Sequence, residues 1–158
     1  MRRGARFSAD GRYRYRLWRR WDRALPVVAF CLLNPSTADA RRDDPTIRRC
    51  IGFARTWGFG GVEVVNLFAL RATDPRQLRR AQDPVGPRND RAIRSAARRA
   101  AVVVLGWGAH PVARRRAGVA ALRLGGARLV TLGRTRGGAP RHPLYLRADT
   151  RPIDASAA

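Results

Sequence analysis

Residues 25–33 of this chain read LPVVAFCLL, an uninterrupted apolar run that ends abruptly at NPSTAD (34–39). Strands buried on both faces of a parallel sheet have this continuous pattern, whereas half-exposed strands alternate. The run therefore predicts an interior strand of a parallel sheet, with Asn34 just beyond its carboxyl end.

The next segment, DDPTIRRCIGFARTWG (43–58), carries the start and stop signals of a helix. Asp44 can cap its first turn, Pro45 suits that turn, and Gly58 can close the helix. Its apolar residues fall at helical spacing on one face. They are Ile47, Cys50, Ile51, Ala54 and Trp57.

Strand and helix patterns then alternate along the chain. Strands are predicted over 61–70, 101–107 and 127–133, and helices over 89–100 and 110–126. This order predicts an α/β fold: a three-layer α/β/α sandwich with a mainly parallel four-stranded sheet and helices on both faces.

The N-terminal stretch RFSADGRYRYRLWRRW (6–21) predicts a β-hairpin that turns at Asp10-Gly11. Tyr13, Tyr15 and Leu17 alternate with Arg12, Arg14 and Arg16, which predicts one aromatic face and one guanidinium face.

The totals fit one domain. The chain has 158 residues and is 45% hydrophobic, and we expect a single domain over residues 1–150 and a flexible tail over 151–158. No apolar run reaches the roughly 20 residues of a membrane helix, and no secretory signal is evident, so we expect a cytoplasmic monomer. Two cysteines, Cys31 and Cys50, are too few for an iron–sulfur or Cys-rich metal site, and we interpret them as buried hydrophobes.

Charge is the strongest compositional signal. The chain has 33 Lys+Arg, all of them arginine, against 11 acidic residues, a formal net charge of +22. Such a surface attracts polyanions, which favours a nucleic-acid partner, although a genome rich in arginine codons explains the missing lysines as well.

Ligands of parallel α/β sheets bind beyond the carboxyl ends of the strands. Here that edge holds NPSTAD (34–39), NLFALR (66–71), GWGAHP (106–111) and GRTRGGAPRHPLYL (133–146). No glycine-rich phosphate loop is among them, which argues against standard binding of nucleoside triphosphates or dinucleotides.

Several side chains of these segments are candidates for a site. Asn34 can orient a water or can simply start a turn, and Asn66 can read a base edge or tie loops together. Phe68 and Trp107 are either base-stacking walls or core.

The last segment holds His142. Its arginines, Arg134, Arg136 and Arg141, are candidates for contacts with the anionic backbone of a nucleic acid. His110, the other histidine, also precedes a proline and can be a capping residue. Two histidines make a metal site improbable.

The segments LLNPSTADARRDDPTIRRCIGFA, VVNLFALRATDP, LGWG and GAPRHPLYL resemble a family of small bacterial and viral proteins known as domain of unknown function 1643. More distantly, the order of the four edge segments is similar to that of the uracil-DNA glycosylase superfamily. That likeness implies that Asn34 positions an attacking water, Asn66 reads the flipped base, and a His142 N–H stabilises the departing base.

The departures from that superfamily are specific. Its most active branch has aspartate where this chain has Asn34, and Pro-Leu-Tyr-Leu replaces its Ser-Pro-containing wedge loop. The leading hypothesis is N-glycosidic cleavage of uracil or a modified base, in DNA rather than RNA, without cofactor or metal. The alternatives are a non-catalytic nucleic-acid-binding module and an enzyme that acts on free modified nucleotides.

Overall fold

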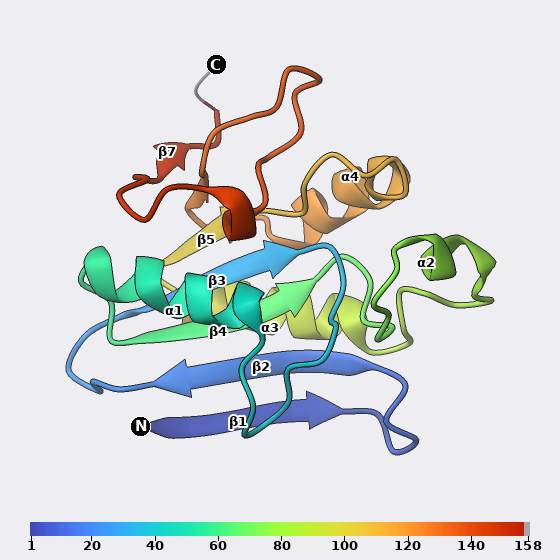
Figure 1. Cartoon of the computed structure of the whole chain (residues 1–158), viewed down its shortest axis with the longest axis horizontal. Helices are drawn as coiled ribbons and strands as arrows, with labels where there is room; N and C mark the ends of the chain where they lie inside the picture. The colour runs from blue at the N-terminus through green and yellow to red at the C-terminus, as the bar shows by residue number, and fades with distance from the viewer. Residues whose placement is uncertain (157–158) are drawn as a thin grey trace.

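Seven strands form one sheet in the order β1-β2-β4-β3-β5-β6-β7 (Figure 1). The computed structural model describes residues 1–156. The strands are β1 Arg2–Phe7, β2 Arg14–Arg20, β3 Val27–Leu32, β4 Gly61–Asn66, β5 Val102–Leu105, β6 Leu129–Thr131 and β7 Ile153–Asp154. The helices are α1 Pro45–Thr56, α2 Arg76–Arg80, α3 Asn89–Arg99, α4 Ala113–Arg123 and the 3-10 turn η1 Pro143–Tyr145.

The prediction of a mainly parallel, four-stranded sheet is wrong in strand number and in strand direction. The four predicted strands, β4, β3, β5 and β6, are parallel to one another. The hairpin strand β2 pairs antiparallel with β4, and β7 pairs antiparallel with β6, so the sheet is mixed. The hairpin therefore extends the sheet instead of standing apart from it.

Helix α1 begins and ends where its sequence predicts. Asp44 accepts a hydrogen bond from the Ile47 N–H at 2.9 Å, and Pro45 occupies the first turn. Gly58, just past the C-cap, has a φ of +85°, a conformation that glycine adopts without steric cost.

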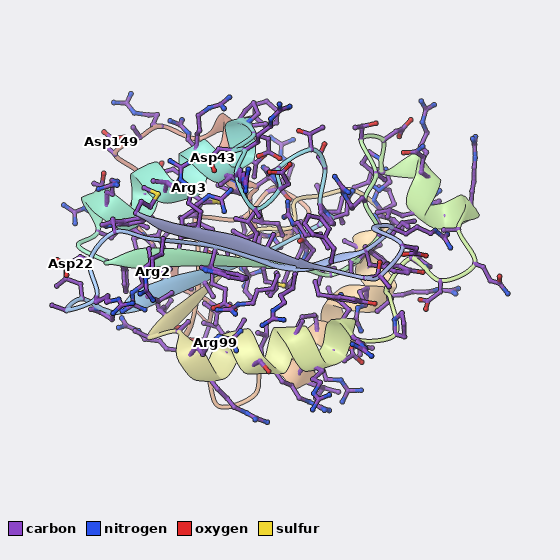
Figure 2. The ribbon with its side chains drawn as sticks, turned by 90° about the horizontal axis from the view of Figure 1, so that it is seen from below. Arg2, Arg3, Asp22, Asp43, Arg99 and Asp149 are labelled. Atoms are coloured by element: carbon purple, nitrogen blue, oxygen red, sulfur yellow. The ribbon has the colours of Figure 1, made fainter. Side chains whose placement is uncertain are left out.

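Helices cover both faces of the sheet, as predicted (Figure 2). On one face α1 contributes Ile47, Cys50 and Phe53 to a core with β3, β4 and β5. On the other face α3 and α4 contribute Ile93, Ala120 and their neighbours to a second core. Both cysteines are buried and free. Cys31 lies in the core on the α3 side and Cys50 in the core on the α1 side, so the two thiols are on opposite faces of the sheet.

Strand β2 pairs with β1 and β4 and is therefore an interior strand. The prediction that Arg14 and Arg16 lie on one face of the hairpin is wrong. Arg6 pairs with Arg16 while Phe7 pairs with Arg14, so Tyr15 is an extra residue that shifts the register. This bulge turns Arg14 to the α1 face, where it is only 3% exposed. Arg16 stays on the α3 face, where it contacts Glu63 of β4.

The segment predicted as a tail, residues 151–158, includes a short strand. Ile153 and Asp154 pair with β6, and the Ala155 N–H donates to the Leu129 carbonyl at 3.0 Å. This pairing covers the outer edge of β6. Residues 157–158 of the predicted tail lie outside the described residues. Across residues 1–156, no helix combines the length and the hydropathy needed to cross a bilayer.

Candidate functional site

The carboxyl ends of β3, β4 and β5 meet at one edge of the sheet because these strands are parallel. β3 and β5 are neighbours in the sheet, and the connections that follow them lead in opposite directions, from β3 to β4 and from β5 to β6. Ligands of α/β sheets bind at such a switch point. A small cavity of about 40 Å³ lies there, and its lining residues include four with strong hydrogen-bonding groups, Arg14, Asn34, Asn66 and His142. Three of the four are predicted site residues.

His142 presents a defined hydrogen-bond donor. It precedes η1, and its Nδ1 accepts a hydrogen bond from the Leu144 N–H at 3.1 Å. Since Nδ1 is the acceptor, the proton of the neutral ring sits on Nε2. Burial lowers the pKa of His142 from its ordinary value of 6.5, and the opposing effect of Asp44 is smaller. The ring is therefore neutral at pH 7 and offers an Nε2–H.

Asn34 is fixed by its amide group. Its Nδ2 donates to the Ala72 carbonyl at 2.7 Å and to the Pro35 carbonyl at 3.1 Å. These bonds use both amide protons and leave Oδ1 as an acceptor without a donor among residues 1–156. This geometry holds an acceptor in place for a donor such as water.

Asn66 ends β4 and is 2% exposed, yet its Oδ1 has no hydrogen-bond partner in the described part of the chain. The structural role considered above, that of tying loops together, belongs to Asn89 instead. Asn89 Nδ2 donates to the carbonyls of Asn66 and Leu67 at 2.8 and 3.0 Å. An unpaired buried acceptor costs about 1–3 kcal/mol, so a ligand that donates to Asn66 removes a penalty.

Arg14 is the cavity residue that sequence analysis missed. Its Nη1 donates to the Ala38 carbonyl at 3.1 Å, while its buried Nε has no partner within residues 1–156. Burial lowers the pKa of Arg14 to about 10, and Asp44 opposes that shift, so the guanidinium is charged at neutral pH. Two residues that line the cavity thus each have an unpaired buried polar atom, the donor Arg14 Nε–H and the acceptor Asn66 Oδ1. The regular alternation of the hairpin sequence gives no signal for Arg14, because its position depends on the register shift at Tyr15.

The other predicted site residues lie elsewhere. Phe68 is 5% exposed and packs in the α3-side core. Trp107, Arg134 and Arg136 line a separate hollow of about 590 Å³ together with His110. Arg134 donates to the carbonyls of Gly138 and Ala155 at 3.0 and 2.7 Å.

Arg141 is exposed, and its Nε donates to the Arg134 carbonyl at 3.2 Å.

No cluster of three or more His, Cys, Asp or Glu side chains suited to a metal occurs in residues 1–156. Burial raises the pKa of the Cys31 thiol to about 12, so this thiol is not a nucleophile at neutral pH.

The lowered pKa of His142 predicts a pH dependence of stability. Well above pH 6.5 the ring is neutral in both the folded and the unfolded state. As pH falls from about 7.5 to about 5.5, the unfolded ring binds a proton more readily than the folded ring, so the folded state is destabilised. The urea midpoint of the wild type should therefore fall relative to that of His142→Gln over this range. A difference between the two proteins that is constant with pH would contradict the assignment.

Comparison with known proteins places these residues inside one family match. Residues 14–144 match the family described as Protein of unknown function (DUF1643), a range that begins at Arg14 and includes His142. No curated protein matches the chain, and no solved structure does.

Proposed function

The chain belongs to the DUF1643 family, and because that description names no activity, we propose from the cavity that it cleaves the N-glycosidic bond of uracil or a modified base in DNA. The observation that carries the proposal is that Asn34, Asn66 and His142, whose neutral ring has its proton on Nε2, line one cavity. The likeness to the uracil-DNA glycosylase superfamily supports the same three roles.

His142 would act on the leaving group. Cleavage of an N-glycosidic bond leaves negative charge on the departing base, and a fixed donor near that charge lowers the barrier. The Nε2–H of His142 is such a donor, since its tautomer is set by Leu144. The charged Arg14 guanidinium in the same cavity stabilises the same charge.

The two asparagines would act on the other reactants. Asn34 Oδ1 accepts a hydrogen bond from the attacking water, because its amide protons are already used. Asn66 Oδ1 accepts from a ring N–H of the base, and Arg14 Nε–H donates to a ring oxygen. A ring that carries a donor beside an acceptor, as uracil does, satisfies both unpaired atoms.

Entry of a base requires the cavity to open. A volume of about 40 Å³ holds about one water, because a water occupies roughly 30 Å³ in the liquid. The proposal therefore includes displacement of the segments 34–44 and 139–146, which border the cavity, when a flipped base enters. Extrusion of that base from a duplex costs a few kcal/mol, and binding to the arginine-rich surface can offset it.

The test is a glycosylase assay with oligonucleotides that contain uracil, hypoxanthine or hydroxymethyluracil, in single- and double-stranded form. We expect an abasic product from at least one of them and a strong reduction with Asn66→Ala. If no substrate yields an abasic product and binding persists with a steep salt dependence, the chain is a nucleic-acid-binding module. Turnover of a free nucleoside or nucleotide instead would point to the third alternative.

The binding module is the second candidate because one observation favours it. The closed cavity leaves no room for a base, whereas the charge of +22 needs no cavity to bind nucleic acid.

A further inference from the structure

A second hollow, of about 780 Å³, lies between the N-terminal hairpin and α3, on the face of the sheet opposite α1. Five arginines line it, and none of its lining residues is acidic within the described chain. We call it the hairpin groove, and its arginines are Arg6, Arg16, Arg88, Arg91 and Arg99. We infer that the hairpin groove binds the phosphate backbone of a single-stranded nucleic acid.

The floor of the groove is preorganised. Glu63 of β4 is 2% exposed and pairs with two guanidiniums. Its Oε1 accepts from Arg16 Nε at 2.7 Å, and its Oε2 accepts from Arg99 Nε at 3.1 Å. One carboxylate thus fixes two positive charges. The Nη1 group of each arginine has no hydrogen-bond partner among residues 1–156, so it can donate to a phosphate.

The wall of the groove carries charge that no carboxylate neutralises. Arg88 and Arg91 are exposed and lie about one turn apart, just before and within α3. Neither they nor Arg6 form an ion pair in the described chain. The nearby acid of α3, Asp90, pairs with Arg116 and Arg123 of α4 instead.

The shape of the groove selects the partner. Its volume is within the roughly 300–1,000 Å³ of small-molecule sites, which is enough for a short run of nucleotides. Planar guanidiniums match phosphate oxygens, and half-buried Phe7 at the rim offers a surface for base stacking. The inference shares with the proposed function only the nucleic-acid partner; it requires no cleavage.

The experiment measures the affinity of the full chain for a fluorescent oligothymidylate, by anisotropy, as a function of salt. Arg88→Gln/Arg91→Gln removes two groove charges, and Arg79→Gln/Arg80→Gln removes two exposed charges of α2 as the matched control. Each phosphate contact contributes about 0.7 to the slope of log K against log salt for a single strand. We expect the groove variant to lose about 1.4 from that slope. Between about 50 and 200 mM salt, the fold-decrease in its affinity should therefore be about seven times smaller than the fold-decrease for the wild type.

Equal slopes for the two double variants would overturn the inference, because the charge would then act diffusely. Equally effective competition by polyglutamate at the same charge concentration would overturn the nucleic-acid assignment. The result is separable from glycosylase activity, because anisotropy measures binding alone and requires no cleavage. A chain that cuts no base but shows the slope change would refute the proposed function and leave the groove in place.

Discussion

Replacing His142 with alanine is expected to lower the rate of base excision at saturating substrate by about 10²- to 10³-fold, the usual effect of removing one donor from a developing negative charge. Among the described residues, His142 is the only histidine that lines the cavity, and its ring proton is on Nε2. Oligonucleotide affinity should change little, because the arginines that attract the backbone are retained. Single-turnover excision and anisotropy binding measure the two quantities separately.

His110 provides a matched control for this experiment. It also precedes a proline, and its Nδ1 accepts from the Val112 N–H at 3.2 Å, as His142 Nδ1 accepts from Leu144. It lines the hollow beside Trp107 instead of the cavity. His110→Ala removes the same local bond, so its excision rate should stay close to wild type. Equal losses in the two variants, or a parallel loss of binding with His142→Ala, would show that the histidine has a structural role only.

Replacing Arg19 with alanine is expected to have the largest effect on stability. Arg19 is fully buried and pairs with Asp43 at 2.8 Å. Its guanidinium also donates to four backbone carbonyls. They belong to Gly4, Trp18, Asp39 and Arg42. Loss of one partner of a buried ion pair costs about 3–5 kcal/mol, because the remaining groups are left unpaired.

Urea and thermal unfolding measure this loss. A cost of about 3–5 kcal/mol corresponds to a decrease in Tm of roughly 6–20 °C for a chain of this size. Arg23→Ala is the control, since Arg23 is exposed and surface substitutions change stability by about 0.5 kcal/mol or less. Arg19→Lys should lie between the two, because it keeps the charge but not the planar set of donors. A loss for Arg19→Ala within 1 kcal/mol of the control would contradict the role given to the buried pair, for which about 3–5 kcal/mol is expected.

The elements with local signals could be predicted from the sequence. The caps of α1 are set by Asp44, Pro45 and Gly58, and β3 is set by an apolar run that suits burial on both faces. The positions of Asn34 and His142 at one edge of the sheet follow from the rule that parallel strands end together. Burial of Arg14 and Arg19 could not be predicted, because the hairpin pattern is typical of a one-sided sheet, whereas β4 pairs with β2 and the segment 34–44 contacts both arginines.

The remaining differences have the same cause, which is contact between distant segments. β7 has two residues, too few for a periodic signal, and forms because β6 has an unpaired edge. Trp107 lines the hollow formed with His110 and the 134–140 loop, and not the cavity, although it lies only two residues after β5. Sequence order gives the edge of the sheet at which a residue lies, but not the side of that edge.

The extra residue at Tyr15 links two surfaces that lie on opposite faces of the sheet. It directs Arg14 into the cavity and leaves Tyr15 and Arg16 on the hairpin groove. Substitutions can alter either surface alone, but an insertion or deletion in this part of β2 shifts the side chains of both. The length of this strand is therefore constrained more tightly than its composition, and we expect changes in length to be tolerated better in the hairpin turn than in the strand.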